Sequence, residues 1–222
     1  MNRMQLTRAL HDARSATERL DQTLAAAETT DPARQSDTLH TLTTDAALQA
    51  ERLTCRLRHL VYRSGAMPQQ GYLRQAAAEV GVKVEVGEGR VTVIFPELLP
   101  NRKRSEHREY LAALVAQALL DANERHPLPR FEQCTLCVVH YFAPKHWMEG
   151  VLPDYDNIEL KAVQDVLASL TMVDDSMRYC DRFETVGIAE QSHTEFLLLP
   201  ERPLRSKIVR DLRQIPQEGS EP

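Results

Sequence analysis

The sequence predicts an α+β fold: a mixed β-sheet with helices packed on one face, preceded by a helical hairpin. Two observations support this prediction. Up to residue 63, apolar side chains recur at alternating steps of three and four, the spacing of helices that pack along a seam. Beyond residue 70, helical patterns and strand-like runs follow one another in the order helix, strand, helix, strand and strand, after an initial hairpin of strands.

The first 63 residues read as two helices separated by a polar break at Asp31-Pro32. The two expected seams are Leu6, Leu10, Ala13, Thr17, Leu20 and Leu24, then Leu39, Leu42, Ala46, Ala50, Leu53, Leu57 and Leu60. Their simplest product is an antiparallel hairpin resembling a coiled coil. Its stripes are too thin for a large core, so we expect it to pack on a protein partner, a second copy or the main domain.

Residues 64–70 read as a linker, 71–200 as the main domain and 201–222 as a basic tail. The turn Gly87-Glu88-Gly89 lies between two runs of alternating valines, which predicts a β-hairpin. Residues 134–142 are apolar on both faces, as expected of an interior strand. The remaining expected elements are helices over 72–80, around 111–119 and from near Asn157 to about Leu170, and strands over about 182–188 and 194–199.

The composition points to a cytoplasmic protein without a membrane partner. No stretch approaches the roughly 20 consecutive apolar residues that a membrane span needs. The four cysteines are few and scattered, and Cys134 and Cys137 form the one CxxC pattern, typical of zinc or redox sites. Since this pattern lies in a strand-like run without a second ligand pair nearby, we expect buried structural thiols. His140, in the same run, is expected to be a core histidine.

Acidic residues are concentrated in one segment of the chain. From residue 154 to residue 175 there are six acidic side chains and one basic side chain, so this segment carries the whole net charge of −5. Clustered carboxylates repel one another unless a cation lies among them or some stay protonated. We therefore predict a site for Mg²⁺, with Mn²⁺ as a substitute, because these ions prefer oxygen ligands. Its predicted ligands are Asp154, Asp156, Asp174 and Asp175.

Each part of this acidic segment also has a purely structural interpretation. Asp156 and Glu159 have the spacing of a capping box at the start of a helix. Lys161 and Asp165 are four residues apart and could form a surface ion pair. Asp174-Asp175 could be a turn. Moreover, Asp175 can join Asp154 and Asp156 only if the chain folds back after the helix.

The order of these residues resembles the signature of the RusA-type Holliday junction resolvases. The resemblance rests on Asp154-x-Asp156-Asn157, a helix carrying Lys161 and Asp165, and a closing Asp174-Asp175. The separation of 19 residues between Asp156 and Asp175 also suits the family, as do the strand before the motif and the two strands after it. Upstream, Pro100-Asn101-Arg102 is similar to a Pro-rich Asn-Arg segment of the family. The resemblance covers residues 91–199.

This resemblance implies a homodimeric endonuclease that uses magnesium to nick four-way DNA junctions symmetrically, and branched DNA as its partner. By position, Asp154, Asp156 and Asp175 would bind the metal, and Lys161 would assist at the scissile phosphate. The expected DNA contacts are Asn101, Arg102, Lys103, Arg104 and Arg108. In the loop before the acidic pair, His146 and Trp147 could stack on an opened base.

Three features depart from the family pattern. Lys161 follows Asp156 by five residues instead of four, and one step on a helix turns a side chain by about 100°. The chain is acidic, whereas phosphate contacts favour a basic protein. The helical hairpin has no counterpart in the family. These departures leave two alternatives open: a DNA-binding module without activity, or a protein-interaction factor acting through the hairpin.

Overall fold

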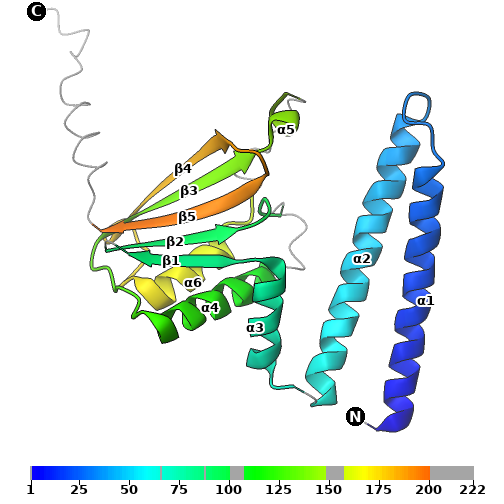
Figure 1. The fold of residues 1–222 in the computed structure, drawn as a ribbon, viewed down its shortest axis with the longest axis horizontal. Coiled ribbons are helices and arrows are strands. Elements are labelled where there is room, and N and C mark those ends of the chain that lie inside the picture. The colour runs from blue at the N-terminus through cyan, green and yellow to red at the C-terminus, as the bar shows by residue number, and fades with distance from the viewer. Residues whose placement is uncertain (1, 66, 88, 101–107, 149–157, 201–222) are drawn as a thin grey trace, which may run out of the picture. The chain divides into compact units, whose positions relative to one another are not determined.

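The computed structural model describes residues 2–65, 67–87, 89–100, 108–148 and 158–200, with the backbone alone for His146 and Trp147. The chain divides into two compact units, Met1–Tyr72 and Leu73–Pro222. The first consists mainly of long helices, and the second contains a five-stranded mixed sheet with helices (Figure 1). The predicted α+β class is therefore confirmed. Across the described residues, no helix is both long enough and apolar enough to cross a lipid bilayer.

The first unit is an antiparallel pair of helices, α1 (Arg3–Glu28) and α2 (Ser36–Ser64). Helix α1 begins with a capping box, in which the Asn2 and Gln5 side chains each accept a hydrogen bond from the other residue's backbone N–H. Helix α2 ends at Gly65, whose φ of 68° is the left-handed conformation that favours glycine. The predicted hairpin is thus present.

The residues that join the two helices differ from the expected seam of α1. The half-buried or buried positions of α1 are mostly small: Ala9, Ala13, Ser15, Ala16, Leu20, Thr23 and Ala27. By contrast, Leu6, Leu10 and Leu24 stay exposed. Small side chains let helix backbones approach closely, and a hydrogen bond of 3.0 Å from Gln49 Nε2 to Thr23 Oγ1 fixes the register. The predicted seam of α2 therefore agrees with its buried and half-buried positions except at Leu57, whereas on α1 it agrees at Ala13 and Leu20 alone.

The second unit is built on a sheet with the strand order β1-β2-β5-β3-β4. Its strands are β1 (Lys83–Gly87), β2 (Arg90–Phe95), β3 (Cys134–Phe142), β4 (Cys180–Ile188) and β5 (His193–Pro200). Neighbouring strands are antiparallel except β3 and β4, which run parallel from the pair Cys134↔Cys180. The predicted β-hairpin and interior strand are both confirmed, with Gly89 at φ 73° in the hairpin turn.

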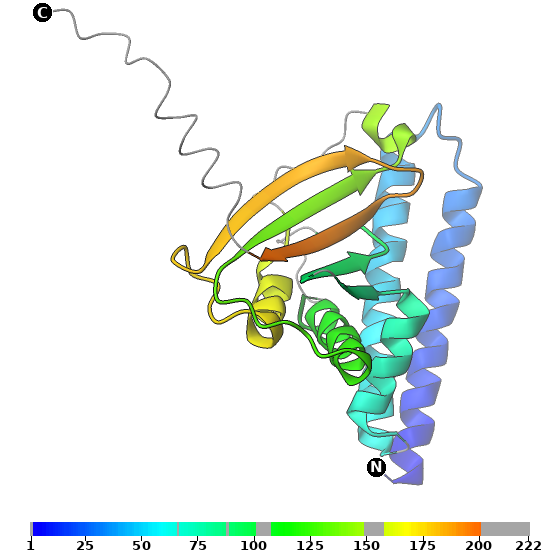
Figure 2. The ribbon, with the colours of Figure 1, turned by 60° about the vertical axis from the view of Figure 1, so that its left-hand side comes forward.

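A parallel pair requires a crossover, and the described part of this crossover contains two helices. After β3 the chain forms α5 (Pro144–Met148) and α6 (Lys161–Thr171), and then returns to the start of β4. Helices α4 (Arg108–Arg125) and α6 pack on one face of the sheet, as Figures 1 and 2 show. Ala77, near the end of α3 (Gln69–Val80), packs against α4 in a smaller cluster. The expected placement of helices on one face is confirmed.

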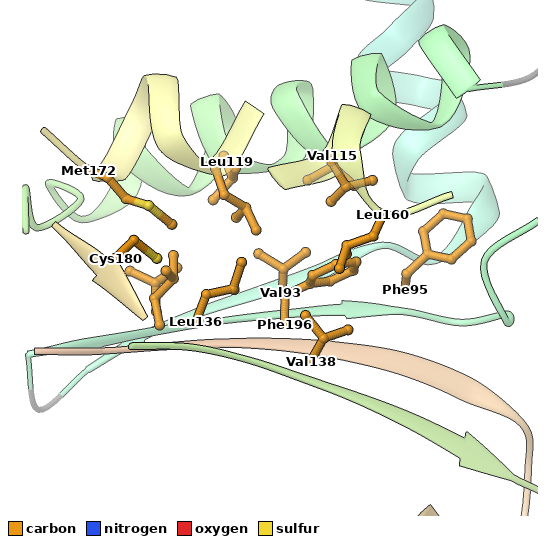
Figure 3. Close-up of a cluster of buried hydrophobic side chains, with 14 of the residues drawn as sticks. Val93, Phe95, Val115, Leu119, Leu136, Val138, Leu160, Met172, Cys180 and Phe196 are labelled. Atoms are coloured by element: carbon orange, nitrogen blue, oxygen red, sulfur yellow. The ribbon is translucent and has the colours of Figure 1, made fainter. Parts of the chain in front are cut away.

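Alternation along the strands directs every second side chain into the core between sheet and helices. Figure 3 shows Val93, Leu136, Val138 and Phe196 pointing from the sheet toward Val115, Leu119 and Leu160. The described part of this unit thus has a continuous apolar layer beneath β2, β5 and β3. Burial of this layer supplies most of the favourable free energy of folding.

The core predicts a contrast between two phenylalanines. Phe196 is fully buried, whereas Phe183 on the edge strand β4 is 45 % exposed. We expect Phe196→Ala to lower the free energy of unfolding by about 3–5 kcal/mol, because it leaves a cavity. The matched Phe183→Ala substitution should cost less than about 1 kcal/mol. Denaturant unfolding of the two variants measures both values, and equal losses would contradict the described core.

Candidate functional site

The chain folds back directly after α6, the condition under which Asp175 can join the acidic pair before that helix. The return is anchored on Phe131, whose N–H donates to the carbonyl of Thr171 at 2.7 Å, while its carbonyl accepts from Val173 N–H at 3.0 Å. Met172, between these two residues, is buried in the core. The segment therefore runs back along α6 rather than away from it.

Asp175 consequently lies beside the first turns of α6. Its Oδ2 accepts a hydrogen bond of 3.2 Å from Nε2 of Gln164, eleven residues earlier in the chain. The other end of the same amide, Gln164 Oε1, accepts from Arg182 Nη1 on β4 at 3.5 Å. The helix, the return segment and the edge strand thus meet in one polar cluster. This cluster of Gln164, Asp175 and Arg182 is called the return cluster below.

Lys161 lies one turn before Gln164, and its nearest described partner is Asp165. The ammonium Nζ donates to Asp165 Oδ1 at 3.0 Å, in an exposed pair four residues apart. This hydrogen bond raises the pKa of Lys161, and the negative charge of Asp175 adds a smaller effect in the same direction. The structure therefore contains the surface ion pair given above as the structural interpretation, and Asp175 acts on the same ammonium through space.

The two closing aspartates have different surroundings. Asp174 Oδ1 accepts from the backbone N–H of Ser176 at 2.6 Å, which closes a turn. This backbone hydrogen bond, together with one from the Ser176 side chain, lowers the pKa of Asp174. Asp174 thus serves the turn, whereas Asp175 is directed to α6.

The start of α6 corrects the expected helix boundary. The helix begins at Lys161 rather than near Asn157, and its N-cap Leu160 makes no side-chain capping hydrogen bond. Ile158, Glu159 and Leu160 are buried and non-helical, and the Glu159 N–H donates to the carbonyl of Pro100 at 3.0 Å. Burial of these residues, rather than capping, determines where the helix starts. The helix that the predicted capping box would begin is therefore not present at residues 158–160.

Several predicted site residues lie outside the described residues. They are Asp154, Asp156, Asn101, Arg102, Lys103 and Arg104, together with the basic tail. Arg108 is the exposed first residue of α4. Within the described ranges, no group of three His, Cys, Asp or Glu side chains has the arrangement of a metal site. The structure thus brings Lys161, Gln164, Asp175 and Arg182 to one end of α6, whereas the predicted ligands Asp154 and Asp156 lie outside the described residues.

Two other predictions concern β3 and are borne out by its side chains. His140 is buried, with Nε2 at 3.1 Å from Glu184 Oε1 and Nδ1 at 3.4 Å from Thr194 Oγ1, so it is a core histidine with partners. Cys134 and Cys137 are buried and form no disulfide. Residues three apart in a strand point to opposite faces, which prevents both thiols from binding one zinc ion.

Sequence reasoning missed Gln164 and Arg182 as members of the cluster. Gln164 could have been recognised as the residue one turn after Lys161 on the expected helix. Arg182 faces the helices because it is two residues after the buried Cys180 in β4. That assignment needs the strand pairing, which the sequence alone does not provide.

Comparison with known proteins places the chain in a family. A family model matches residues 2–212, nearly the whole sequence. The chain belongs to DUF6100, a family of unknown function. No curated protein matches the DUF6100 chain. A similar solved structure is a candidate translation initiation inhibitor from Salmonella typhimurium, with 8 % identity over 55 % of this chain and 99 % of that one, and a TM-score of 0.23. A TM-score this low does not support an inference about function.

The pairing of Lys161 in the DUF6100 chain leads to a prediction about its titration. Asp165→Asn should lower the pKa of Lys161, since it removes a direct hydrogen bond and a negative charge. Asp175→Asn should lower it less, because Asp175 acts through space alone. NMR titration of the labelled Lys161 ammonium measures both shifts. Glu85→Gln on β1, at the opposite edge of the sheet, is the control. A larger shift in Asp175→Asn than in Asp165→Asn would contradict the described pairing.

Proposed function

We propose that this protein is a magnesium-dependent endonuclease that recognises branched DNA structure and nicks four-way junctions as a homodimer in the cytoplasm. The observation that carries the proposal is the return of the chain after α6. It brings Asp175 within 3.2 Å of Gln164, beside the helix that follows the Asp154-x-Asp156 motif by a few residues. Asp175 thus lies near the start of α6, the end of the helix that follows Asp154 and Asp156 in the sequence.

The corrected start of α6 gives further support. In the sequence, a helix beginning at Asn157 would explain Asp156 as its cap. The observed helix begins at Lys161, so Asp156 loses this structural explanation. Ile158 is buried in the core and follows Asp156 by two residues, a separation that spans at most about 7 Å. A functional explanation for Asp156 is thereby favoured.

The donor set fits a hard divalent cation. Asp154, Asp156 and Asp175 would supply carboxylate oxygens, the ligands that Mg²⁺ and Mn²⁺ prefer. The amide of Gln164 donates a hydrogen bond to Asp175 and brings no positive charge to it. When bound, the metal would polarise the scissile phosphate and lower the pKa of an attacking water. Lys161 and Arg182 are cationic side chains near Asp175 that could stabilise charge on the phosphate oxygens.

One observation favours a second candidate, a junction-binding module without cleavage. Lys161 follows Asp156 by five residues, and its ammonium is bonded to Asp165. A lysine held by a neighbouring carboxylate is less free to assist at a phosphate. This candidate predicts retention of junctions on native gels with no cleavage at any magnesium concentration.

The first prediction of the leading proposal concerns the carboxylates. With a labelled four-way junction and Mg²⁺, the protein should produce paired symmetric nicks, and EDTA should abolish them. Asp156→Asn and Asp175→Asn should each reduce the nicking rate by at least about a hundredfold, the scale of losing one charge-stabilising group. Asp174→Asn should reduce it much less, because asparagine can close the same turn.

Circular dichroism of each variant would show whether the fold is retained. Intact DNA in every lane, with the junction nonetheless retarded on a native gel, would replace the endonuclease by the binding module. Nicking that persists in Asp156→Asn would remove this residue from the mechanism.

A second prediction concerns DNA affinity. Replacing Arg102, Lys103 and Arg104 together by alanine should weaken junction binding and reduce the slope of log affinity against log salt by about one per lost phosphate contact. The control is Lys83→Ala with Arg90→Ala, two exposed cations of the β1–β2 hairpin. Fluorescence anisotropy at several salt concentrations measures the slopes. Equal effects of the two sets would indicate general charge attraction instead of a defined contact.

A further inference from the structure

The helical hairpin carries a second apolar stripe that its own two helices leave uncovered. Leu10 is 52 % exposed and Leu24 is 46 % exposed on α1, and Leu57 is 42 % exposed on α2. In a two-helix hairpin, one apolar seam per helix is sufficient for pairing. A wider apolar face is typical of helices that pack in larger bundles.

These leucines lie on one side of the hairpin. Leu10 and Leu24 are fourteen residues apart, or two heptads, and so share one flank of α1 beside the buried Ala13. Leu57 lies eleven residues after the buried Ala46 of α2, and Leu24 lies eleven residues after Ala13. When two helices are antiparallel, residues rotated from the seam by the same angle about their own helix axes point to the same side of the pair. The three leucines, with Leu6, therefore define one face, called the leucine face below.

Charge is separated along the hairpin. The base consists of residues 3–14 and 52–63, which the antiparallel pairing brings to the same end, and it contains seven arginines and one aspartate. The tip, residues 18–51, contains seven acidic residues and two arginines. The base thus has a formal charge of +6 and the tip −5. A second hairpin placed head to tail would pair basic with acidic at both ends.

We propose that the leucine face binds a second copy of this chain, with the two α1 helices antiparallel. The exposed leucines of α1 fit this arrangement, because Leu6 and Leu24 exchange places when one α1 is reversed against another. Leu6 then faces the partner's Leu24, and Leu10 lies one turn further along the same contact. Arg3 at the base lies next to the partner's Glu28 at the tip. The exposed leucines, which do not join α1 to α2, thus join α1 to its twofold copy.

The size of the face is sufficient for a stable dimer. Helix α1 has 26 residues, which at 1.5 Å per residue gives about 40 Å. Two helices about 10 Å apart make a face about 20 Å wide, or about 800 Å² per copy. This is the area that a standard protein interface buries on each partner. A parallel dimer would instead place +6 against +6, which electrostatic complementarity disfavours.

Nucleic acid is the alternative ligand for the arginine-rich end of the hairpin, residues 3–14 and 52–63. It would explain the arginines, but neither the exposed leucines nor the acidic tip. The second copy explains all three features. This inference does not depend on the nuclease proposal, because it concerns the first unit and is tested without DNA.

The first experiment measures the mass of the full-length protein by sedimentation equilibrium. Wild type should be a dimer at micromolar concentration. Leu10→Lys with Leu24→Lys should raise the dimer dissociation constant at least about a hundredfold, because it buries unpaired charges. The control Leu120→Lys replaces a leucine of similar exposure, 39 %, on α4 and should leave the dimer unchanged. A monomeric wild type, or a dimer insensitive to the double variant, would overturn the proposal.

The second experiment tests orientation by charge reversal. Arg3→Glu and Glu28→Arg should each weaken the dimer about three- to tenfold, and their combination in one chain should restore it. Higher salt should weaken the wild-type dimer. A combination no better than either single variant, or a dimer strengthened by salt, would overturn the antiparallel arrangement. If single reversals instead reduce junction binding and leave the mass unchanged, the basic base is a DNA surface and the proposal is wrong.

Discussion

The parallel pairing of β3 with β4 is the constraint on which the rest of the sheet unit depends. Antiparallel neighbours can be joined by a tight turn, but a parallel neighbour requires the chain to return to the end of the sheet where it began. Here the return consists of α6 and the segment anchored on Phe131. Because the register begins at Cys134↔Cys180, the acidic turn before β4 must approach this end of the sheet. The position of Asp175 is thus a consequence of strand order.

Much of this architecture could be predicted from the sequence, because periodicity is a local property. Alternating valines determined the β1–β2 hairpin, and the unbroken apolar run of residues 134–142 determined an interior strand with the observed bounds. The start of α6 could not be predicted in this way. Asp156 and Glu159 have the local spacing of a cap, but Ile158 and Leu160 are drawn into the core, and this tertiary burial outweighs a capping preference of about 1 kcal/mol.

The two seams of α1 show another limit of local reasoning. Leucines every three or four residues indicate an apolar stripe but do not identify what it packs against. On α1 the contact with α2 uses mainly alanines, with Ser15, Leu20 and Thr23, and the small side chains allow a close approach. Likewise, the return cluster joins Gln164 to Asp175, eleven residues later, and to Arg182, eighteen residues later. A sequence pattern as short as one helix therefore does not include all three residues. Partners across the fold depend on pairing and register, which composition and spacing leave open.

The bond between Lys161 and Asp165 has a further consequence for Asp175. A lysine ammonium beside an unoccupied carboxylate would act as an internal counterion, and an incoming cation would first have to displace it. In the described residues, Asp165 binds this ammonium at 3.0 Å, while Asp175 receives a neutral amide at 3.2 Å. Asp165 therefore binds the ammonium of Lys161 in place of Asp175. The carboxylate of Asp175 is thus held by a neutral side chain, while the positive charge of Lys161 is bonded elsewhere.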